Sequence, residues 1–208
     1  MNNSELCEMA KKQENRGDIE KAYQLYLEAA IAEDDGEAMY ALAQMYFEGD
    51  YVHQDYDKAG RYFGMAYDHK ADIQPWTLIM AGGYWEQRDD RSDEDVLIAI
   101  KYYQAAVDLG VGFGHECLGK IYIELGEYDK AYEHLSQMEG RNPCGFYYMG
   151  KLYDEGLGVE QDMEKAIYNY KKAVECGLKH EAEYGEDDDT AKAKRRLSDL
   201  NIDWKNVQ

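Results

Sequence analysis

The side chains that could carry covalent or metal chemistry are four cysteines and five histidines spread over 208 residues. The cysteines are Cys7, Cys117, Cys144 and Cys176. No two of them have the Cys-x-x-Cys spacing of a zinc or redox site. His180 and Glu181 could open a metalloprotease helix, but the second histidine of that motif is missing. The sequence therefore predicts no metal site.

Two further stretches are similar to ligand-binding motifs only superficially. The acids at 186–189 lack the ligand alternation and the turn glycine of a calcium loop. The glycine-rich residues 110–114 follow a helical pattern, whereas a dinucleotide-binding fingerprint follows a strand. No nucleophile lies in a recognisable elbow or triad pattern. We therefore expect no cofactor and no catalytic residue, and the protein is predicted not to be an enzyme.

The most regular stretch of the chain runs from Phe146 to Val174 and contains two amphipathic segments. The apolar residues of the first segment share one helical face; they are Tyr147, Met149, Gly150, Leu152 and Tyr153. Those of the second also share a face; they are Ala166, Ile167, Tyr170, Ala173 and Val174. Gly156 suits the position after a helix, where a positive φ is needed, and Asp162 suits the N-cap of the next helix. The pattern predicts a helical hairpin.

The same hairpin recurs when the chain is aligned on a small residue of the first helix and an alanine of the second. The copy at 38–66 matches best and without a gap. Its matching residues are Leu42, Ala43, Tyr46, Gly49, Val52, Gln54, Asp55, Lys58, Ala59, Phe63 and Ala66. Two shorter copies begin near Ser4 and Phe113, and a looser copy around Ala81 has a turn enlarged by the charged run at 88–95. A hairpin cannot bury its apolar face alone, so the copies are expected to stack.

Small residues at the aligned position predict close contact between the two helices of each hairpin. A glycine or alanine lets the backbones approach to the short end of the usual 8–10 Å range, and a large side chain one turn away fills the adjacent groove. Replacing Gly119 or Gly150 with a bulky residue is expected to cost about 1–3 kcal/mol through overpacking.

These residues carry a family resemblance. The pattern A-x3-L-[GA]-x2-Y-x2-G, then a turn with valine and aspartate, then KA-x3-[YF]-x2-A, resembles the Sel-one-like repeat, a relative of the tetratricopeptide repeat. The copies at 4–32 and 113–138 are more similar to the tetratricopeptide form itself. The resemblance covers nearly the whole chain. It implies an all-α fold, a right-handed α-α superhelix (solenoid) of about five helical hairpins plus a C-terminal capping helix.

We expect a single repeat solenoid over residues 1–208. The expected hairpins cover approximately 3–36, 37–72, 73–110, 112–141 and 142–177, and an acidic turn and cap follow at 178–208. In the cap, Ala193 and Leu197 match the start of a first helix, and Trp204 is expected to fold back onto the last hairpin. Four basic residues are expected to keep the open end of the stack hydrated; they are Lys192, Lys194, Arg195 and Arg196.

Charge limits the classes of partner. A net charge of −20 and a pI near 4.5 argue against nucleic acid, since phosphate contacts need clustered lysine and arginine, and equally against an anionic membrane. A basic protein or peptide is compatible, although a soluble acidic surface explains the charge as well. The N-terminus lacks the apolar core of a signal peptide and no apolar run reaches the ~20 residues of a membrane span, so we expect a cytoplasmic protein, or an exported one if a signal peptide was removed.

The resemblance implies a non-catalytic scaffold or adaptor for protein–protein interaction, because such proteins are similar to one another as scaffolds. The alternative is a hydrolase-type activity or β-lactam binding, as suggested for some exported relatives. Some exported relatives also carry disulfides between the two helices of a repeat, and Cys144 and Cys176 are placed at the same end of one hairpin. Free thiols are favoured here because the cytoplasm keeps them reduced.

In tetratricopeptide-like arrays the first helix of each hairpin lines the concave face, through residues three before, one after and four after the small residue. The positions selected for partner binding are Tyr40, Gln44, Phe47, Leu78, Trp85, Glu116, Lys120, Ile123, Tyr147, Lys151 and Asp154. Aromatic anchors and two lysines in equivalent places suit a short peptide with apolar side chains and a carboxylate. The open alternative is that Phe47 and Trp85 only pack between repeats.

Overall fold

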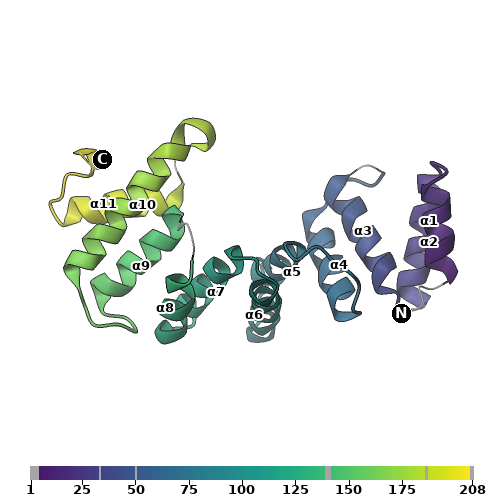
Figure 1. Ribbon diagram of the computed structural model, residues 1–208, viewed down its shortest axis with the longest axis horizontal. Helices are drawn as coiled ribbons and strands as arrows, with labels where there is room; N and C mark the ends of the chain where they lie inside the picture. Colours follow the sequence, from purple (N-terminus) through teal and green to yellow (C-terminus); the bar gives the residue numbers. More distant parts are fainter. Residues whose placement is uncertain (1–4, 33, 50, 139–141, 186, 207–208) are drawn as a thin grey trace. The chain divides into compact units, whose positions relative to one another are not determined.

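The computed structural model describes residues 5–32, 34–49, 51–138, 142–185 and 187–206 (Figure 1). Every regular element in these residues is helical, which confirms the all-α prediction. The helices are α1 (Glu5–Glu14), α2 (Ile19–Ala32), α3 (Gly36–Glu48), α4 (Tyr56–Asp68), α5 (Thr77–Glu86), α6 (Asp93–Asp108), α7 (Phe113–Glu124), α8 (Tyr128–Ser136), α9 (Pro143–Glu155), α10 (Met163–Tyr184), α11 (Asp188–Asp199) and the 3-10 helix η1 (Trp204–Asn206).

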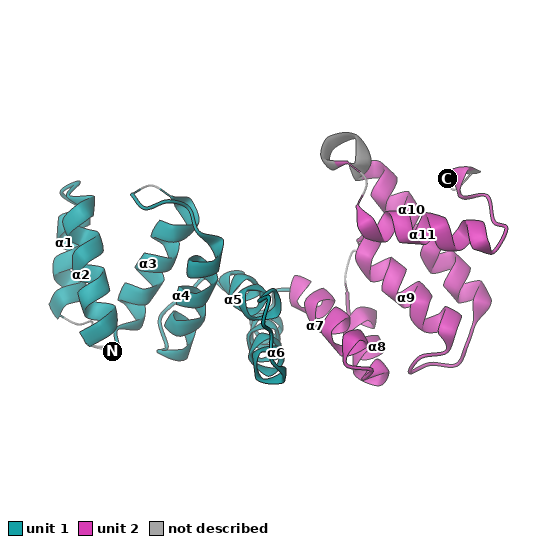
Figure 2. Ribbon diagram, turned by 180° about the vertical axis from the view of Figure 1, so that it is seen from behind, with its two compact units in different colours: residues 1–111 teal, residues 112–208 magenta. Residues whose placement is uncertain are grey.

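The chain forms two compact units, Met1–Val111 (unit 1) and Gly112–Gln208 (unit 2), coloured separately in Figure 2. Unit 1 contains the hairpins α1/α2, α3/α4 and α5/α6, and consecutive hairpins pack on one another. Unit 2 contains the hairpins α7/α8 and α9/α10, with α11 packed against both helices of the latter. The prediction of one continuous solenoid over residues 1–208 concerns the relation between the units and stays a prediction.

The helix ends follow the signals in the sequence. Gly156 ends α9 with φ +68°, in the left-handed region, and Asp162 accepts a hydrogen bond from the backbone N–H of Lys165 at 3.0 Å. In α3/α4, Gly49 ends α3 with φ +76° and Asp55 accepts from the N–H of Lys58 at 2.9 Å. Each glycine supplies a conformation that other residues adopt at a cost, and each carboxylate satisfies an orphan N–H. The predicted caps are confirmed.

The predicted close contact within hairpins is also present. A Cβ on Gly119 would lie 2.6 Å from Leu135, and one on Gly150 would lie 2.8 Å from the Tyr170 ring. Leu135 and Tyr170 are fully or almost fully buried. The large side chain of the second helix therefore occupies the space that a Cβ on the glycine would need.

In some hairpins the large residue of the second helix is a tyrosine. Its buried hydroxyl then donates a hydrogen bond to a carboxylate at the end of the first helix. Tyr26 donates to Glu14 at 2.7 Å and Tyr170 donates to Asp154 at 3.0 Å. Tyr103 and Glu86 make the same pair in α5/α6. Burial, together with the partner carboxylate, raises the pKa of the Tyr26 and Tyr170 hydroxyls far above their ordinary value, so these groups remain donors.

The C-terminal helix is bound through a partly buried ion pair. Arg196 donates from Nε to Asp154 Oδ2 at 2.6 Å and from Nη2 to Oδ1 at 2.9 Å. The expectation that Arg196 lies on the outer face of the cap is wrong, because its guanidinium points to the preceding hairpin. Ala193 and Leu197 are fully buried against α10, and Trp204 packs on the same cluster. The cap is thus attached by apolar burial and by a bidentate, charge-assisted contact.

Helix α10 continues past the predicted end of the fifth hairpin at residue 177 and runs to Tyr184. Gly177 is buried in the middle of this helix, and a Cβ there would lie 2.6 Å from Thr190 Cγ2 at the start of α11. The sequence suggested that Gly177 ends the helix, whereas Gly177 permits close approach of α11. The glycine after the helix is Gly185, with φ +81°.

The two histidines of the α7/α8 hairpin lie in contact. The Nδ1 atoms of His115 and His134 are 3.0 Å apart, and the ring of Tyr122 stacks on His134 with 5.6 Å between centroids. A hydrogen bond between the two imidazoles needs one donor and one acceptor nitrogen. When both rings are protonated, both nitrogens are donors and the acceptor is lost. The contact therefore depends on at least one ring being neutral.

Gly177→Ala is expected to lower the free energy of unfolding of unit 2 by about 1–3 kcal/mol, because the new methyl overlaps Thr190. The matched control is Gly83→Ala on α5, where a Cβ finds its nearest atom, Tyr103 Oη, at 3.8 Å. There the gain in helix propensity should stabilise by about 0.5–1 kcal/mol. Chemical denaturation measures both changes. Equal effects of the two substitutions would contradict the packing argument.

Arg196→Gln is expected to destabilise unit 2 by about 1.5–3 kcal/mol, since it leaves the buried Asp154 carboxylate without its bidentate partner. Arg195 is the control, because it is exposed, and Arg195→Gln should change stability by less than about 0.5 kcal/mol. At roughly 2–4 °C per kcal/mol, the two melting temperatures should differ by several degrees. Identical melting curves would show that the ion pair does not fix α11.

Acidification is expected to destabilise the α7/α8 hairpin. Burial, and then the neighbouring His115, lower the pKa of His134, so the folded hairpin holds this ring neutral. Unfolded histidine takes up a proton near pH ~6.5, so stability is present above that pH and is lost as the pH falls below it.

Hydrogen exchange of the α7 and α8 amides, corrected for the intrinsic rate, should therefore accelerate between pH 7 and pH 5.5. His134→Gln should flatten this dependence, whereas His53→Gln, at an exposed loop position, should leave it unchanged. A flat profile in the parent protein would contradict the role of the histidine pair.

Candidate interaction surface

A groove opens between the first helices α1 and α3 of unit 1. Its pocket has a volume of about 260 Å³ and contains two of the predicted partner-binding residues, Tyr40 and Gln44. The other lining residues are Lys11, Glu14, Tyr26, Glu37, Ala41, Met45 and Glu48. Residues 37, 41, 44 and 48 recur at helical spacing, so one stripe of α3 faces the groove.

A second pocket, also of about 260 Å³, adjoins the first. It shares Glu14, Met45 and Glu48 with it and adds Ile19 and Tyr51. Glu14 and Glu48 are the last residues of α1 and α3. Two adjoining pockets therefore share a rim of carboxylates and an apolar wall; below we call the two together the α1/α3 groove.

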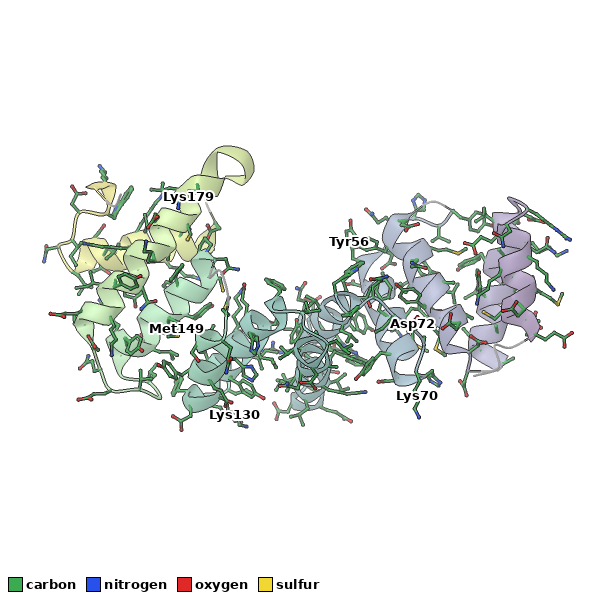
Figure 3. All side chains as sticks on the ribbon, viewed as in Figure 1. Tyr56, Lys70, Asp72, Lys130, Met149 and Lys179 are labelled. Atoms are coloured by element: carbon green, nitrogen blue, oxygen red, sulfur yellow. The ribbon has the colours of Figure 1, made fainter. Side chains whose placement is uncertain are left out.

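Next to this groove, unit 1 carries a chain of aromatic rings. The ring centroids of Phe47 and Trp76 are 5.4 Å apart, those of Phe63 and Trp76 6.0 Å, and those of Phe47 and Tyr56 5.7 Å. Tyr40 joins the chain through Phe63 at 5.6 Å. Trp76 is 43% exposed and Tyr56, labelled in Figure 3, is 56% exposed. We call Tyr40, Phe47, Tyr56, Phe63 and Trp76 the aromatic cluster.

The predicted residues of α5 differ in their surroundings. Leu78 is fully buried in the core of unit 1 and contributes no surface. Trp85 is half-buried; its ring packs edge-on against Tyr84 at 5.2 Å and the guanidinium of Arg88 lies over it at 5.3 Å. A third pocket of about 210 Å³ adjoins Tyr84 and Tyr56.

In unit 2, the predicted residues of α7 are tied to α9. Glu116 is only 4% exposed, forms an ion pair with Lys120 at 3.3 Å and accepts from the Asn142 side chain. Lys120 also contacts the Cys144 thiol; burial alone would lower the pKa of its ammonium, but the Glu116 carboxylate outweighs burial and raises it. Burial raises the pKa of the Cys144 thiol, which keeps it protonated and poorly nucleophilic. Lys120 is thus engaged within the chain.

The predicted residues of α9 are divided between core and surface. The Asp154 carboxylate is 5% exposed and accepts from Arg196 and Tyr170. Tyr147 is half-buried, with its ring 5.9 Å from Tyr170 and the Lys192 ammonium 5.7 Å above it. Lys151 is half-buried and has no ion pair or hydrogen bond among the described side chains. Ile123 of α7 packs half-buried against the Leu135 cluster.

The described residues contain no group of three or more histidine, cysteine, aspartate or glutamate side chains that could hold a metal ion. All four cysteines are free thiols, so Cys144 and Cys176 are not bonded to each other. Over the same part of the chain, no helix has the length and apolar character needed to cross a membrane.

Sequence reasoning missed two parts of this surface. Trp76 stands directly after Pro75 at a helix start, and a large aromatic beside a proline at an exposed helix end was the available signal. Glu14 and Glu48 were also missed, although acids in the last turn of a helix oppose its dipole and are therefore informative.

The Sel1 repeat family matches the chain at residues 13–34, 36–70, 80–111 and 147–178, more than half of its length. The crystal structure of a Sel1 repeat protein from Oxalobacter formigenes has a TM-score of 0.53 at 16% identity, covering 95% of this chain and 84% of its own. At that identity the similarity shows the fold alone.

Two further solved structures are similar at lower scores. The protective antigen c5321 of uropathogenic Escherichia coli, which displays an SLR fold, has a TM-score of 0.43 at 18% identity; the match covers 93% of this chain and 52% of that one. A putative sel1 repeat protein from Klebsiella pneumoniae subsp. pneumoniae has a TM-score of 0.36 at 20% identity, covering 86% of this chain and 89% of that one.

Proposed function

Because the chain belongs to the Sel1 repeat family, whose members are generally protein-interaction scaffolds, we propose that it is a non-catalytic scaffold that binds a protein or peptide through the first helices of its hairpins. The observation that carries this proposal is the partly exposed aromatic cluster beside the α1/α3 groove. Tryptophan and tyrosine dominate the energetics of interfaces when they fill well-packed pockets.

The exposed area of Trp76 is large enough to contribute to the binding of a partner. A tryptophan side chain can bury up to about 250 Å², so the 43% exposed on Trp76 leaves roughly 100 Å² for a partner. At ~25 cal/mol per Å², covering that area contributes about 2.5 kcal/mol before association costs. Tyr56 and Tyr51 of unit 1 are also partly exposed, at 56% and 41%.

The proposed contacts are the members of the predicted set that retain surface. In unit 1 these are Tyr40, Gln44, Phe47 and Trp85, to which Trp76 is added. In unit 2 they are Ile123, Tyr147 and Lys151, with Lys120 already engaged by Glu116. Leu78, Glu116 and Asp154 are buried, so they are not among the proposed contacts. A cytoplasmic location is part of the proposal, and the four free thiols fit a reducing compartment.

The test is retention of partners from native lysate on the immobilised full chain, followed by affinity measurement with the partner identified. Trp76→Ala, Trp85→Ala and Lys151→Glu should each raise the dissociation constant about tenfold or more, since hot-spot truncations cost 2 kcal/mol and above. Lys151 makes no ion pair or hydrogen bond among the described residues, so Lys151→Glu breaks no such contact, and its melting curve separates an effect on binding from an effect on folding. Lys120→Glu is avoided because it would place a second carboxylate beside buried Glu116.

The matched control is Leu97→Ala on α6, a second helix, where the leucine is 65% exposed. It should leave the retained proteins and the affinity unchanged. Circular dichroism melting of each variant verifies the fold. If Leu97→Ala abolishes retention while the first-helix variants keep it, the partner binds the opposite face and the proposal is wrong.

A further inference from the structure

We infer that the α1/α3 groove of unit 1 takes up lysine or arginine side chains of an extended, positively charged peptide segment. This inference rests on the proposed function and names the chemistry of the partner for one part of the surface. It differs from the sequence-based expectation of a partner carboxylate, which rested on the lysines of unit 2.

The α1/α3 groove carries mainly negative charge. Its rim carries Glu14, Glu37 and Glu48, and among the described residues that line it Lys11 alone is basic. Lys11 lies 3.8 Å from both Glu8 and Glu37, so it compensates Glu37 and leaves Glu14 and Glu48 uncompensated by any lining cation. Both pockets share these two carboxylates. The surrounding chain adds to the field, because residues 1–111 hold 23 acidic and 10 basic side chains.

The backbone adds negative charge to the same groove. Glu14 and Glu48 are the last residues of α1 and α3, where unpaired carbonyl groups give a helix a partial negative charge. The carboxylates and the C-terminal ends of the two helices are therefore both negative, and both favour a cation in the groove. Glu14 also accepts from Tyr26 at 2.7 Å, which fixes its orientation. Glu48 has no ion pair or hydrogen bond among the described residues.

The walls of the groove match the apolar stem of a lysine or arginine side chain. Lysine and arginine place apolar methylenes against apolar surface while the charged head stays with polar partners. In the α1/α3 groove, Met45, Ala41 and Ile19 supply apolar wall, and Tyr40 and Tyr51 supply aromatic faces that attract cations. An acidic side chain would instead meet the carboxylates of Glu14, Glu37 and Glu48 there.

The volume of each pocket fits an amino-acid side chain better than a drug-sized small molecule. Each pocket, at about 260 Å³, is far larger than the ~30 Å³ share of one water and lies below the ~300–1,000 Å³ typical of drug-sized ligand sites. Two such pockets with a shared rim suit two long side chains that project from the same face of one extended segment. In an extended strand these are residues i and i+2.

The experiment uses the full chain and fluorescein-labelled heptapeptides, acetyl-GTKTKTG-amide and its acidic counterpart acetyl-GTETETG-amide, in 0.15 M salt. Anisotropy should show saturable binding of the basic peptide and none of the acidic one. Glu48→Gln should weaken binding about threefold and Glu14→Gln/Glu48→Gln about tenfold. Ala41→Trp, which fills the first pocket without changing charge, should also weaken binding at least fivefold.

The charge-matched control is Glu28→Gln/Glu94→Gln, which removes two exposed acids from the second helices α2 and α6. It should change the affinity less than twofold. If both double variants weaken peptide binding equally, the peptide is attracted by the acidic chain as a whole, and the inference that it binds in the α1/α3 groove is wrong. Binding that survives Ala41→Trp, or binding of GTETETG with equal affinity, would overturn it as well.

Glu14 also accepts a hydrogen bond from Tyr26, so Glu14→Gln could destabilise the fold. If the double variant melts at a lower temperature, the affinity of Glu48→Gln alone decides the test. Failure here is distinguishable from failure of the proposed function. If the basic peptide does not bind, partners retained from lysate in a manner sensitive to Trp85→Ala and Lys151→Glu still support a scaffold.

Discussion

The fold depends on the close approach of two helices within each hairpin, at a position where the first helix offers no side chain or only a methyl group. Into this space the second helix places one large residue, such as Phe63, Leu135 or Tyr170, which is buried almost completely. A single pair of positions therefore fixes the distance between the helices and supplies much of the local core. This contact therefore sets the position of the first helix relative to the second.

The chemistry of that large residue then determines what lies at the end of the first helix. Where it is tyrosine, its hydroxyl is buried and must donate, and a carboxylate such as Glu14 or Asp154 accepts. Where it is phenylalanine or leucine, no such demand exists. In unit 2 the same carboxylate has a second role, because Asp154 also receives Arg196 and so holds the C-terminal helix.

The sequence predicted the elements well because their signals are local. Small and large residues at helical spacing, Gly156 after a helix and Asp162 before one are all recognised within a few residues. It failed where a residue has two possible uses that only a distant partner distinguishes. Gly177 looked like a helix end, but its partner Thr190 lies on the next helix; Arg196 looked like a solvated cap residue, but its partner is Asp154. For the surface, spacing alone placed Leu78 and Trp85 in one class, although the first is core and the second is half-buried.

The position of Glu48 links stability to function. A carboxylate in the last turn of a helix opposes the helix dipole, which at exposed sites costs about 0.3–1 kcal/mol. Glu14 is offset by the hydrogen bond from Tyr26, whereas Glu48 has no such partner among the described residues. An acid there gains nothing in the folded chain, and neutralising it should leave stability equal or higher. A cationic side chain from outside the chain is the partner that turns this unfavourable charge into a favourable contact.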